Sequence, residues 1–265
     1  MALSISKAWD ETKAIAARDG RLIGAVALAL FVLPGLILDL VTPETTPGTF
    51  PKVGPWVAVA LVGGIISLAG QLAIIRLAMG PQLTVGEAIL HGVRRLPSYF
   101  GAALIWLLPL VVIGYTLVNQ VLANPENPNP TATLGLLVLT PVFAYFSVKF
   151  SLNAAVGSAE VASPLAILRR SWELTAGHWW KLFGFVVLFG AGVLALVVAV
   201  ETVSGVLAKL ALSSTDRGTV GGLLVALIGQ VVSAAASSTF FVMLARIYLQ
   251  LAGKGASVGV PNSGT

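Results

Sequence analysis

Six long apolar runs alternate along the chain with short polar or charged segments. A helix that crosses the hydrocarbon core of a bilayer needs about 20 largely apolar residues, so each run predicts one membrane-spanning helix. The six expected spans are Leu22–Leu40, Val53–Ala73, Phe100–Leu122, Leu134–Val156, Leu182–Leu207 and Val220–Leu244. The pattern therefore predicts an all-α, polytopic membrane protein, since helices satisfy their own backbone hydrogen bonds in lipid.

The segments after the first, third and fifth runs are short and rich in proline, asparagine and glycine, which end helices. These segments cover residues 42–48, 124–130 and 213–218. Each pair of spans is therefore expected to form a helical hairpin. Small residues inside the spans, such as Gly63, Ser67, Ser233 and Ser237, are expected to let helix backbones approach closely.

A charged, amphipathic segment precedes each expected hairpin and begins with a helix start signal. Ser163 followed by Pro164 combines an N-cap residue with a proline at the first helical position. Thr84 and Glu87 have the spacing of a capping box. Ser6 precedes acids that the helix dipole favours in a first turn. We therefore expect three short interfacial helices, one before each hairpin.

These patterns indicate a unit of one surface helix and two spans that occurs three times. The expected units cover residues of about 4–80, 81–160 and 161–252, within a single domain of residues 1–250. Residues 253–265 are expected to form a flexible C-terminal tail.

The composition argues against a soluble fold. Hydrophobic residues make up 57% of the chain and charged residues 10%, whereas soluble domains have about 45–50% and about 25%. Lipid accepts the apolar exterior that such a chain must expose. The chain has no cysteine, which excludes disulfides, zinc–thiolate sites and cysteine nucleophiles. A polar segment of mixed charge precedes the first apolar run, so a cleavable signal peptide is not expected.

The basic residues fall very unevenly between the two sides of the predicted membrane. Thirteen lie on the side of the N-terminus: Lys7, Lys13, Arg18, Arg21, Arg76, Arg94, Arg95, Lys149, Arg169, Arg170, Lys181, Arg246 and Lys254. Lys52, Lys209 and Arg217 lie on the other side. Since basic flanks stay in the cytoplasm, we expect both termini to lie inside a bacterial inner membrane. The pI of about 9.7 then reflects topology rather than nucleic-acid binding.

Five basic residues of the second and third amphipathic segments are candidate ligands for anionic lipid headgroups. They are Arg94, Arg95, Arg169, Arg170 and Lys181. A helix that lies in the headgroup plane turns its basic residues toward lipid phosphates and its apolar face into the membrane. Arg169 and Glu173 also have the i,i+4 spacing of a helical ion pair. The simpler alternative is that these helices only anchor and orient the spans.

Four polar residues within or beside the expected spans are candidate functional groups, because ionisable side chains are costly in hydrocarbon. They are Arg76, Lys149, Asn153 and Arg246. The three bases hold comparable places near inner span ends, so we expect them to be approximate equivalents in the three units. They would form an anion site, or else simply snorkel to the inner surface. Asp39 and Glu201 lie near outer span ends and are expected to face water.

The sequence carries no convincing catalytic or metal-binding pattern. Residues Gly255–Gly259 match the spacing of a nucleophile elbow, but they lie in the expected tail without the required strand and helix. His91 and His178 belong to the surface segments and lack metal-binding spacing. We therefore expect a non-enzymatic protein without a cofactor or a metal.

The stretches Pro164–Thr175 and His178–Gly184 together resemble the signature of a broad family of six-span bacterial membrane proteins. That family includes the membrane domain attached to some glycerophosphoryl diester phosphodiesterases and the YciC-like inner-membrane proteins. The resemblance implies a six-span fold. It implies no phosphodiesterase activity, because in the fused members a separate soluble barrel domain carries the chemistry, and no such domain fits in this chain.

The sequence thus leads us to expect an inner-membrane protein that binds or organises lipids, or supports envelope homeostasis, with anionic headgroups as its partners. One alternative is a small permease or exporter with a site near Lys149. Another is a membrane anchor for a partner protein. Nucleic acid is not an expected partner, and the sequence identifies neither a ligand nor an oligomeric state.

Overall fold

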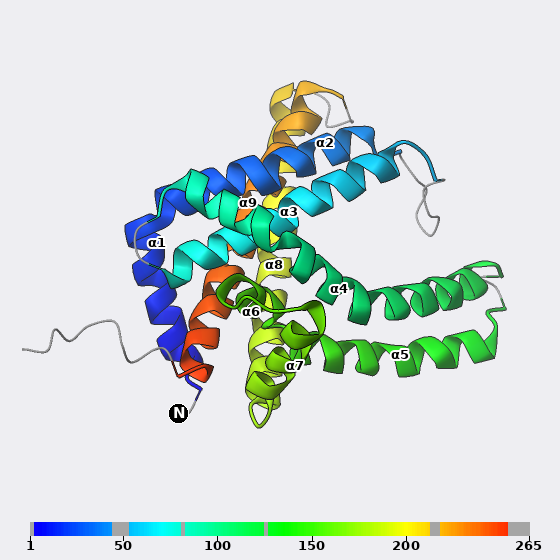
Figure 1. Cartoon of the computed structure of the whole chain (residues 1–265). Coiled ribbons are helices and arrows are strands. Elements are labelled where there is room, and N and C mark those ends of the chain that lie inside the picture. Colours follow the sequence, from blue (N-terminus) through cyan, green and yellow to red (C-terminus); the bar gives the residue numbers. More distant parts are fainter. Residues whose placement is uncertain (1–2, 44–52, 81–82, 125–126, 213–217, 254–265) are drawn as a thin grey trace, which may run out of the picture.

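The computed structural model describes residues 3–43, 53–80, 83–124, 127–212 and 218–253, and the elements within these ranges are helical. In chain order they are α1 (Ile5–Ala27), the π-helical segment η1 (Leu28–Val32), α2 (Leu33–Val41), α3 (Trp56–Met79), α4 (Val85–Leu122), α5 (Pro130–Lys149), α6 (Asn153–Ala159), α7 (Pro164–Thr175), α8 (Trp179–Leu212) and α9 (Val220–Leu251) (Figure 1). The first three form one continuous, bent helix.

Six helical stretches of the described chain are long and apolar enough to cross a membrane. They are Ile5–Val41, Trp56–Met79, Val85–Leu122, Pro130–Ala159, Trp179–Leu212 and Val220–Leu251. The prediction of an all-α chain with six spans is confirmed, and helix length and hydropathy make this an integral, multi-pass membrane protein. Lys52, Arg217, Lys254 and the expected tail after Gly253 lie outside the described residues.

The predicted arrangement of three separate interfacial helices is not confirmed. Only the third amphipathic segment forms a helix of its own, α7, and it ends just before Gly177, whose φ is 76°. Glycine adopts this left-handed conformation without strain, so the chain turns there. The first two amphipathic segments continue into their spans within α1 and α4. Pro97 lies inside α4, and the helix continues past it although proline removes one backbone hydrogen bond.

Side-chain caps fix the starts of these helices close to the predicted positions. Ser163 caps α7 through a hydrogen bond that its hydroxyl accepts at 3.4 Å. Thr84 and Glu87 form the predicted capping box, with reciprocal hydrogen bonds of 3.3 and 2.9 Å. In the first unit the cap is Ser4 rather than Ser6, so α1 begins two residues earlier than expected. The threefold repeat itself stays a prediction.

The fourth span differs most from its prediction, because α5 stops at Lys149 and α6 begins separately at Asn153. The Ser151 hydroxyl donates to the carbonyl oxygen of Val148 at 2.8 Å. From α7, the Ser171 hydroxyl donates to the carbonyl oxygen of Lys149 at 2.9 Å. Such side-chain bonds compete with helix continuation, so they explain why the apolar run does not form one helix.

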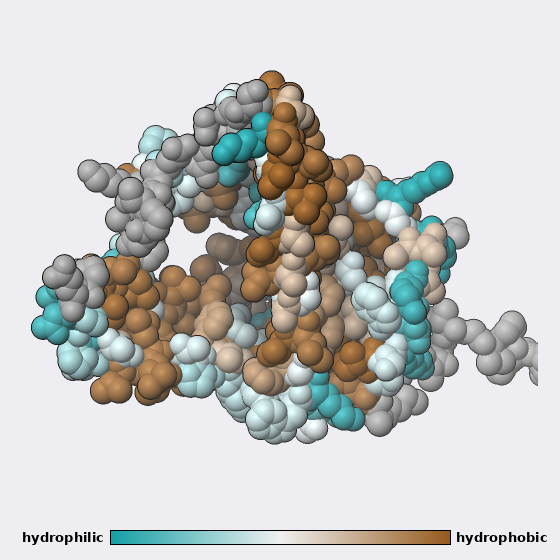
Figure 2. All heavy atoms as spheres, turned by 180° about the vertical axis from the view of Figure 1, so that it is seen from behind, coloured by the Kyte–Doolittle hydropathy of each residue, from teal (hydrophilic) through white to brown (hydrophobic). Residues whose placement is uncertain are grey.

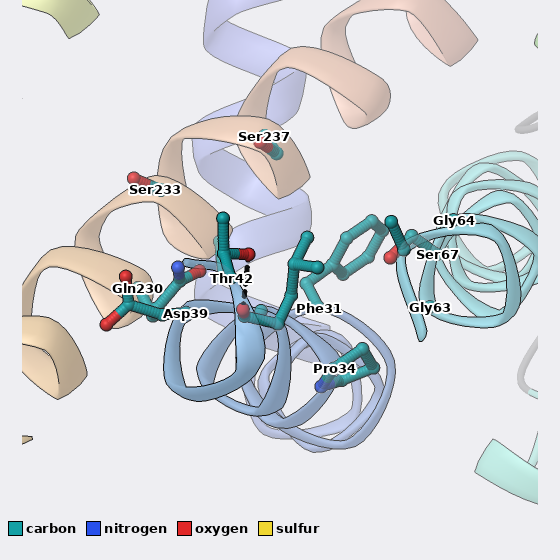
Figure 3. Close-up of a pocket in the computed structure, with 14 residues that line it drawn as sticks. Phe31, Pro34, Asp39, Thr42, Gly63, Gly64, Ser67, Gln230, Ser233 and Ser237 are labelled. Atoms are coloured by element: carbon teal, nitrogen blue, oxygen red, sulfur yellow. Dashed lines mark hydrogen bonds between the residues drawn. The ribbon is translucent and has the colours of Figure 1, made fainter. Parts of the chain in front are cut away.

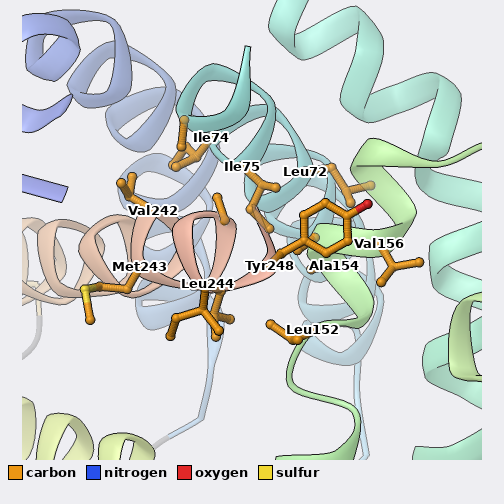
Figure 4. Close-up of a cluster of buried hydrophobic side chains, with 14 of the residues drawn as sticks. Leu72, Ile74, Ile75, Leu152, Ala154, Val156, Val242, Met243, Leu244 and Tyr248 are labelled. Carbon is orange, nitrogen blue, oxygen red and sulfur yellow. The ribbon is translucent and has the colours of Figure 1, made fainter. Parts of the chain in front are cut away.

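The buried core lies where the ends of α1, α3 and α9 meet α6 and α7. Figure 4 shows its centre, where Ile75 of α3, Tyr248 of α9 and Val156 of α6 come together. Away from this core, α4 and α5 run together in a direction different from that of α2 and α3 (Figure 1). Figure 2 shows apolar atoms along much of the exterior. Lipid is the solvent that suits such a surface.

Gly92 lets the first part of α4 rest directly on the backbone of α3. A Cβ at Gly92 would overlap the carbonyl oxygen of Ala69, whereas a Cβ at Gly86, on the same helix, would meet no atom within 4 Å. The two glycines therefore form a matched pair for testing this contact.

We expect Gly92→Ala to lower the free energy of unfolding by about 1–3 kcal/mol, because α3 and α4 must separate. Gly86→Ala should leave it unchanged or raise it by up to about 1 kcal/mol, since alanine favours helix. Thermal unfolding of both variants in detergent, followed by circular dichroism, checks the prediction. Equal midpoints for the two variants would contradict the close approach.

Candidate functional site

The two predicted headgroup arginines on α7 are both paired with acids. Arg169 Nε lies 3.1 Å from Glu173 Oε1, which is the predicted i,i+4 pair. Arg170 Nε lies 3.5 Å from Glu160 Oε1, and its Nη1 lies 3.8 Å from Glu173 Oε2. These pairs offset much of the positive charge that α7 would otherwise offer to a lipid phosphate.

The other three headgroup candidates, Arg94, Arg95 and Lys181, make no ion pair or hydrogen bond through their side chains with a described residue. Arg94 and Lys181 are exposed, and Arg95 is half-buried. The arginines lie in the first half of α4, and the lysine lies in the first turn of α8. We call these three residues the unpaired basic set, because their charge remains available to a ligand.

Glu160 joins α6, α7 and α9 through a network that the sequence does not signal. The Tyr248 hydroxyl donates to Glu160 Oε1 at 2.7 Å, and Arg170 Nε approaches the same oxygen. Tyr248 is fully buried near the end of α9. Because Glu160 and Tyr248 stand 88 residues apart, no local spacing could have revealed the pair.

The three bases predicted to be equivalent lie in three different environments. Arg246 Nε is 2.6 Å from Glu11 Oε2, so α9 is tied to α1 by an ion pair. Arg76 is half-buried in the last turn of α3. Lys149 is the last residue of α5, and its carbonyl oxygen accepts a hydrogen bond from Ser171 of α7. The contacts of the described residues therefore do not gather these bases around one site.

Lys149 and Asn153, at the break between α5 and α6, are both buried. Lys149 is 8% exposed as a residue. Its Nζ lies 4.6 Å from the ring centroid of Trp172 and 5.9 Å from that of Tyr145. Asn153 is 3% exposed, and its Oδ1 has no hydrogen-bond partner within the described structure. Asn153 is thus buried with an unsatisfied acceptor, whereas the Nζ of Lys149 is not a fully buried atom.

A cavity of about 520 Å³ with both apolar and polar walls lies between α2, α3 and α9 (Figure 3). Its polar lining residues are Asp39, Thr42, Ser67, Gln230, Ser233 and Ser237. A second hollow of about 270 Å³ shares three of these residues and adds Glu201 of α8. Among the described residues, no Lys, Arg or His lines either hollow. The lining is therefore rich in hydrogen-bond acceptors and carries negative charge.

The wall of this cavity contains a local break in helical geometry at Pro34. Proline has no N–H, so the carbonyl oxygen of Leu30 loses its usual donor in the helix. The Ser67 hydroxyl of α3 donates to that carbonyl oxygen at 3.1 Å. The preceding residues take the wider π-helical turn η1, in which the N–H of Leu33 donates to Leu28. Single π-helical turns of this kind are frequent at functional sites.

Small side chains make room for the polar groups of the cavity. Gln230 packs so closely on α2 that a Cβ at Gly35 would overlap its Oε1. The sequence predicted packing roles for Gly63, Ser67 and Ser233, and water-facing positions for Asp39 and Glu201. It did not predict that these residues converge, because their meeting depends on how α2, α3, α8 and α9 pack. The sequence signal that could have indicated this cavity is that the serines of α3 and α9 share predicted spans or neighbouring spans with Asp39 and Glu201.

We expect Tyr248→Phe to lower the free energy of unfolding by about 1–3 kcal/mol, because Glu160 loses a partly buried, charge-assisted hydrogen bond. Tyr145→Phe is the matched control, since the Tyr145 hydroxyl makes no hydrogen bond with a described residue. Thermal unfolding in detergent measures both changes. A Tyr248→Phe midpoint equal to that of the control would show that the network contributes nothing to stability.

The chain matches no protein-family model, no curated protein and no solved structure. The family resemblance at Pro164–Gly184 therefore stays a prediction. What the six apolar helices do establish is the coarser class, a multi-pass membrane protein.

Proposed function

We propose that this protein is a non-enzymatic, multi-pass protein of the bacterial inner membrane that binds anionic lipid headgroups beside the first half of α4 and the first turn of α8. The observation that carries the proposal is the unpaired basic set, Arg94, Arg95 and Lys181, which has no acidic partner among the described residues. Each base near an anionic membrane surface contributes about 1 kcal/mol of attraction. Three such bases favour enrichment of anionic lipid beside α4 and α8.

The surrounding side chains support the same reading. Trp180, next to Lys181, is 77% exposed, and Trp172 is 38% exposed. Tryptophan prefers the boundary between headgroups and hydrocarbon, so these rings are suited to an interfacial level. The positive-inside rule would then place this end, with the N-terminus, in the cytoplasm. The resemblance to the phosphodiesterase membrane domain fits a role in lipid or envelope homeostasis.

We expect the variant Arg94→Gln/Arg95→Gln/Lys181→Gln to retain several-fold less phosphatidylglycerol, relative to phosphatidylethanolamine, than the wild-type protein. The reason is the loss of three unpaired charges, each of which contributes about 1 kcal/mol. Mass spectrometry of the lipids that co-purify at low and at high salt gives the ratio.

Arg169→Gln/Arg170→Gln is the control, because the acids Glu160 and Glu173 already offset both arginines. This variant should change the lipid ratio less than the triple variant does. An unchanged ratio in the triple variant would overturn the proposed function.

A second candidate function is a small permease or exporter, which the cavity between α2, α3 and α9 favours. Polar groups inside membrane-spanning helices are costly and commonly mark a ligand or ion path. The cavity differs from the expected location, since it is lined by Asp39 and Gln230 rather than by Lys149. The glycines and the helical break at Pro34 resemble the interrupted helices that line transporter sites.

Water access to the cavity tests this candidate directly, because the chain has no cysteine and a single new thiol can be labelled cleanly. We expect Ser233→Cys to react with a charged methanethiosulfonate on the order of tenfold faster than Leu194→Cys, since thiolates form in water and not in hydrocarbon. Leu194 is an exposed, apolar residue of α8 that lines neither hollow. Equally slow reaction at both positions would remove the support for a permease.

A further inference from the structure

Lys149 is the one buried base among the described lysines and arginines, and it has no anionic partner there. Other bases that pack against neighbouring helices do have acids beside them, as Arg246 has Glu11 and Arg170 has Glu160. The Lys149 residue is 8% exposed, but its Nζ is not among the fully buried polar atoms that lack a hydrogen-bond partner, so the ammonium end reaches the surface. Lys149 therefore presents a cation without a protein acceptor at a place that an anion can approach.

Two aromatic rings flank the Lys149 ammonium. Its Nζ lies 4.6 Å from the ring centroid of Trp172 and 5.9 Å from that of Tyr145. Ring faces attract a cation, but they accept no strong hydrogen bond, so the three N–H groups remain unsatisfied by these contacts. Tyr145 and Trp172 are themselves 40% and 38% exposed, so the pair forms a partly open rim around the ammonium.

Helix α7 holds this arrangement in place. The hydroxyls of Ser171 and Thr175 donate to the carbonyl oxygen of Lys149 at 2.9 and 3.3 Å. Trp172 follows Ser171 directly and also packs at a tilted angle against Phe150, with ring centroids 5.9 Å apart. The ring therefore cannot turn away without breaking contacts on both sides. The ammonium is positioned before any ligand arrives, which lowers the entropy cost of binding.

We infer that Lys149 is the binding site for a single phosphate-bearing anion, with Tyr145 and Trp172 as the rim that packs against the rest of the ligand. The phosphate oxygens would accept the hydrogen bonds that the ammonium lacks. A phospholipid headgroup and free phosphate share this chemistry. The inference rests on the proposed function for its class of ligand, and it adds one specific site to the general attraction of the unpaired basic set.

The test compares Lys149→Met with Lys209→Met, an exposed lysine of the last turn of α8, in detergent. Phosphatidylglycerol, phosphatidylcholine and inorganic phosphate are added separately at matched ionic strength, and thermal midpoints and retained lipid are measured. Phosphatidylglycerol should raise the wild-type midpoint more than phosphatidylcholine does, and native mass spectrometry should show one tightly retained anion. Lys149→Met should lose this shift and bind roughly tenfold more weakly, whereas Lys209→Met should behave as the wild-type protein does.

Lys149→Met without added ligand should be at least as stable as the wild-type protein, because the ammonium makes no hydrogen bond or ion pair with a described residue and methionine keeps the packed apolar stem. A purely structural lysine would instead give a less stable variant with an unchanged shift, and that result would overturn the inference. If the variant does not fold, the ligand-induced shifts of the wild-type midpoint still test the inference. Equal shifts with phosphatidylglycerol and phosphatidylcholine, together with none from inorganic phosphate, would also overturn it. A shift with inorganic phosphate alone would support the site and identify free phosphate as its ligand.

The outcomes separate this inference from the proposed function. Loss of the phosphatidylglycerol shift in Lys149→Met, with an unchanged lipid ratio in the triple variant of the unpaired basic set, would support the site and overturn the general mechanism. The reverse result would support the general mechanism and overturn the site.

Discussion

In a hydrocarbon environment each backbone N–H and carbonyl group must find its partner inside the protein, and this constraint governs where the helices can break. The chain departs from regular helix within a span at Pro34 and at the end of α5. In both places a hydroxyl from another helix takes the freed carbonyl oxygen, Ser67 at Leu30 and Ser171 at Lys149. The two candidate ligand sites adjoin these breaks, because a break is where polar side chains are needed.

Some of the basic side chains, like the freed carbonyl oxygens, have a partner on a neighbouring helix. Arg170 shares Glu160 with Tyr248, and Arg246 pairs with Glu11, so these bases hold helices together. Arg94, Arg95 and Lys181 have no such partner within the described structure. These five bases thus divide into two that hold helices together and three whose charge is available to a ligand. The three available bases are the ones that the proposed function uses.

Hydropathy was enough to predict the six spans, because transfer of about 20 apolar residues into lipid outweighs local preferences. The capping box at Thr84 was equally readable, since its two partners stand three residues apart. The cavity at Gln230 and the Glu160 network were not readable, because each depends on residues from distant parts of the chain. The end of α5 was missed for the same reason, as the hydroxyl that completes it belongs to α7.

The end of α5 at Lys149 also affects how the protein fits its membrane. Helix α5 has 20 residues, which at about 1.5 Å per residue gives about 30 Å, close to the thickness of a bilayer's hydrocarbon layer. A single helix from Pro130 to Ala159 would have 30 residues and reach about 45 Å. It would have to tilt steeply or deform the surrounding lipid. By donating hydrogen bonds to the carbonyl oxygen of Lys149 at the end of α5, helix α7 therefore sets the hydrophobic length of a span to which it does not itself belong.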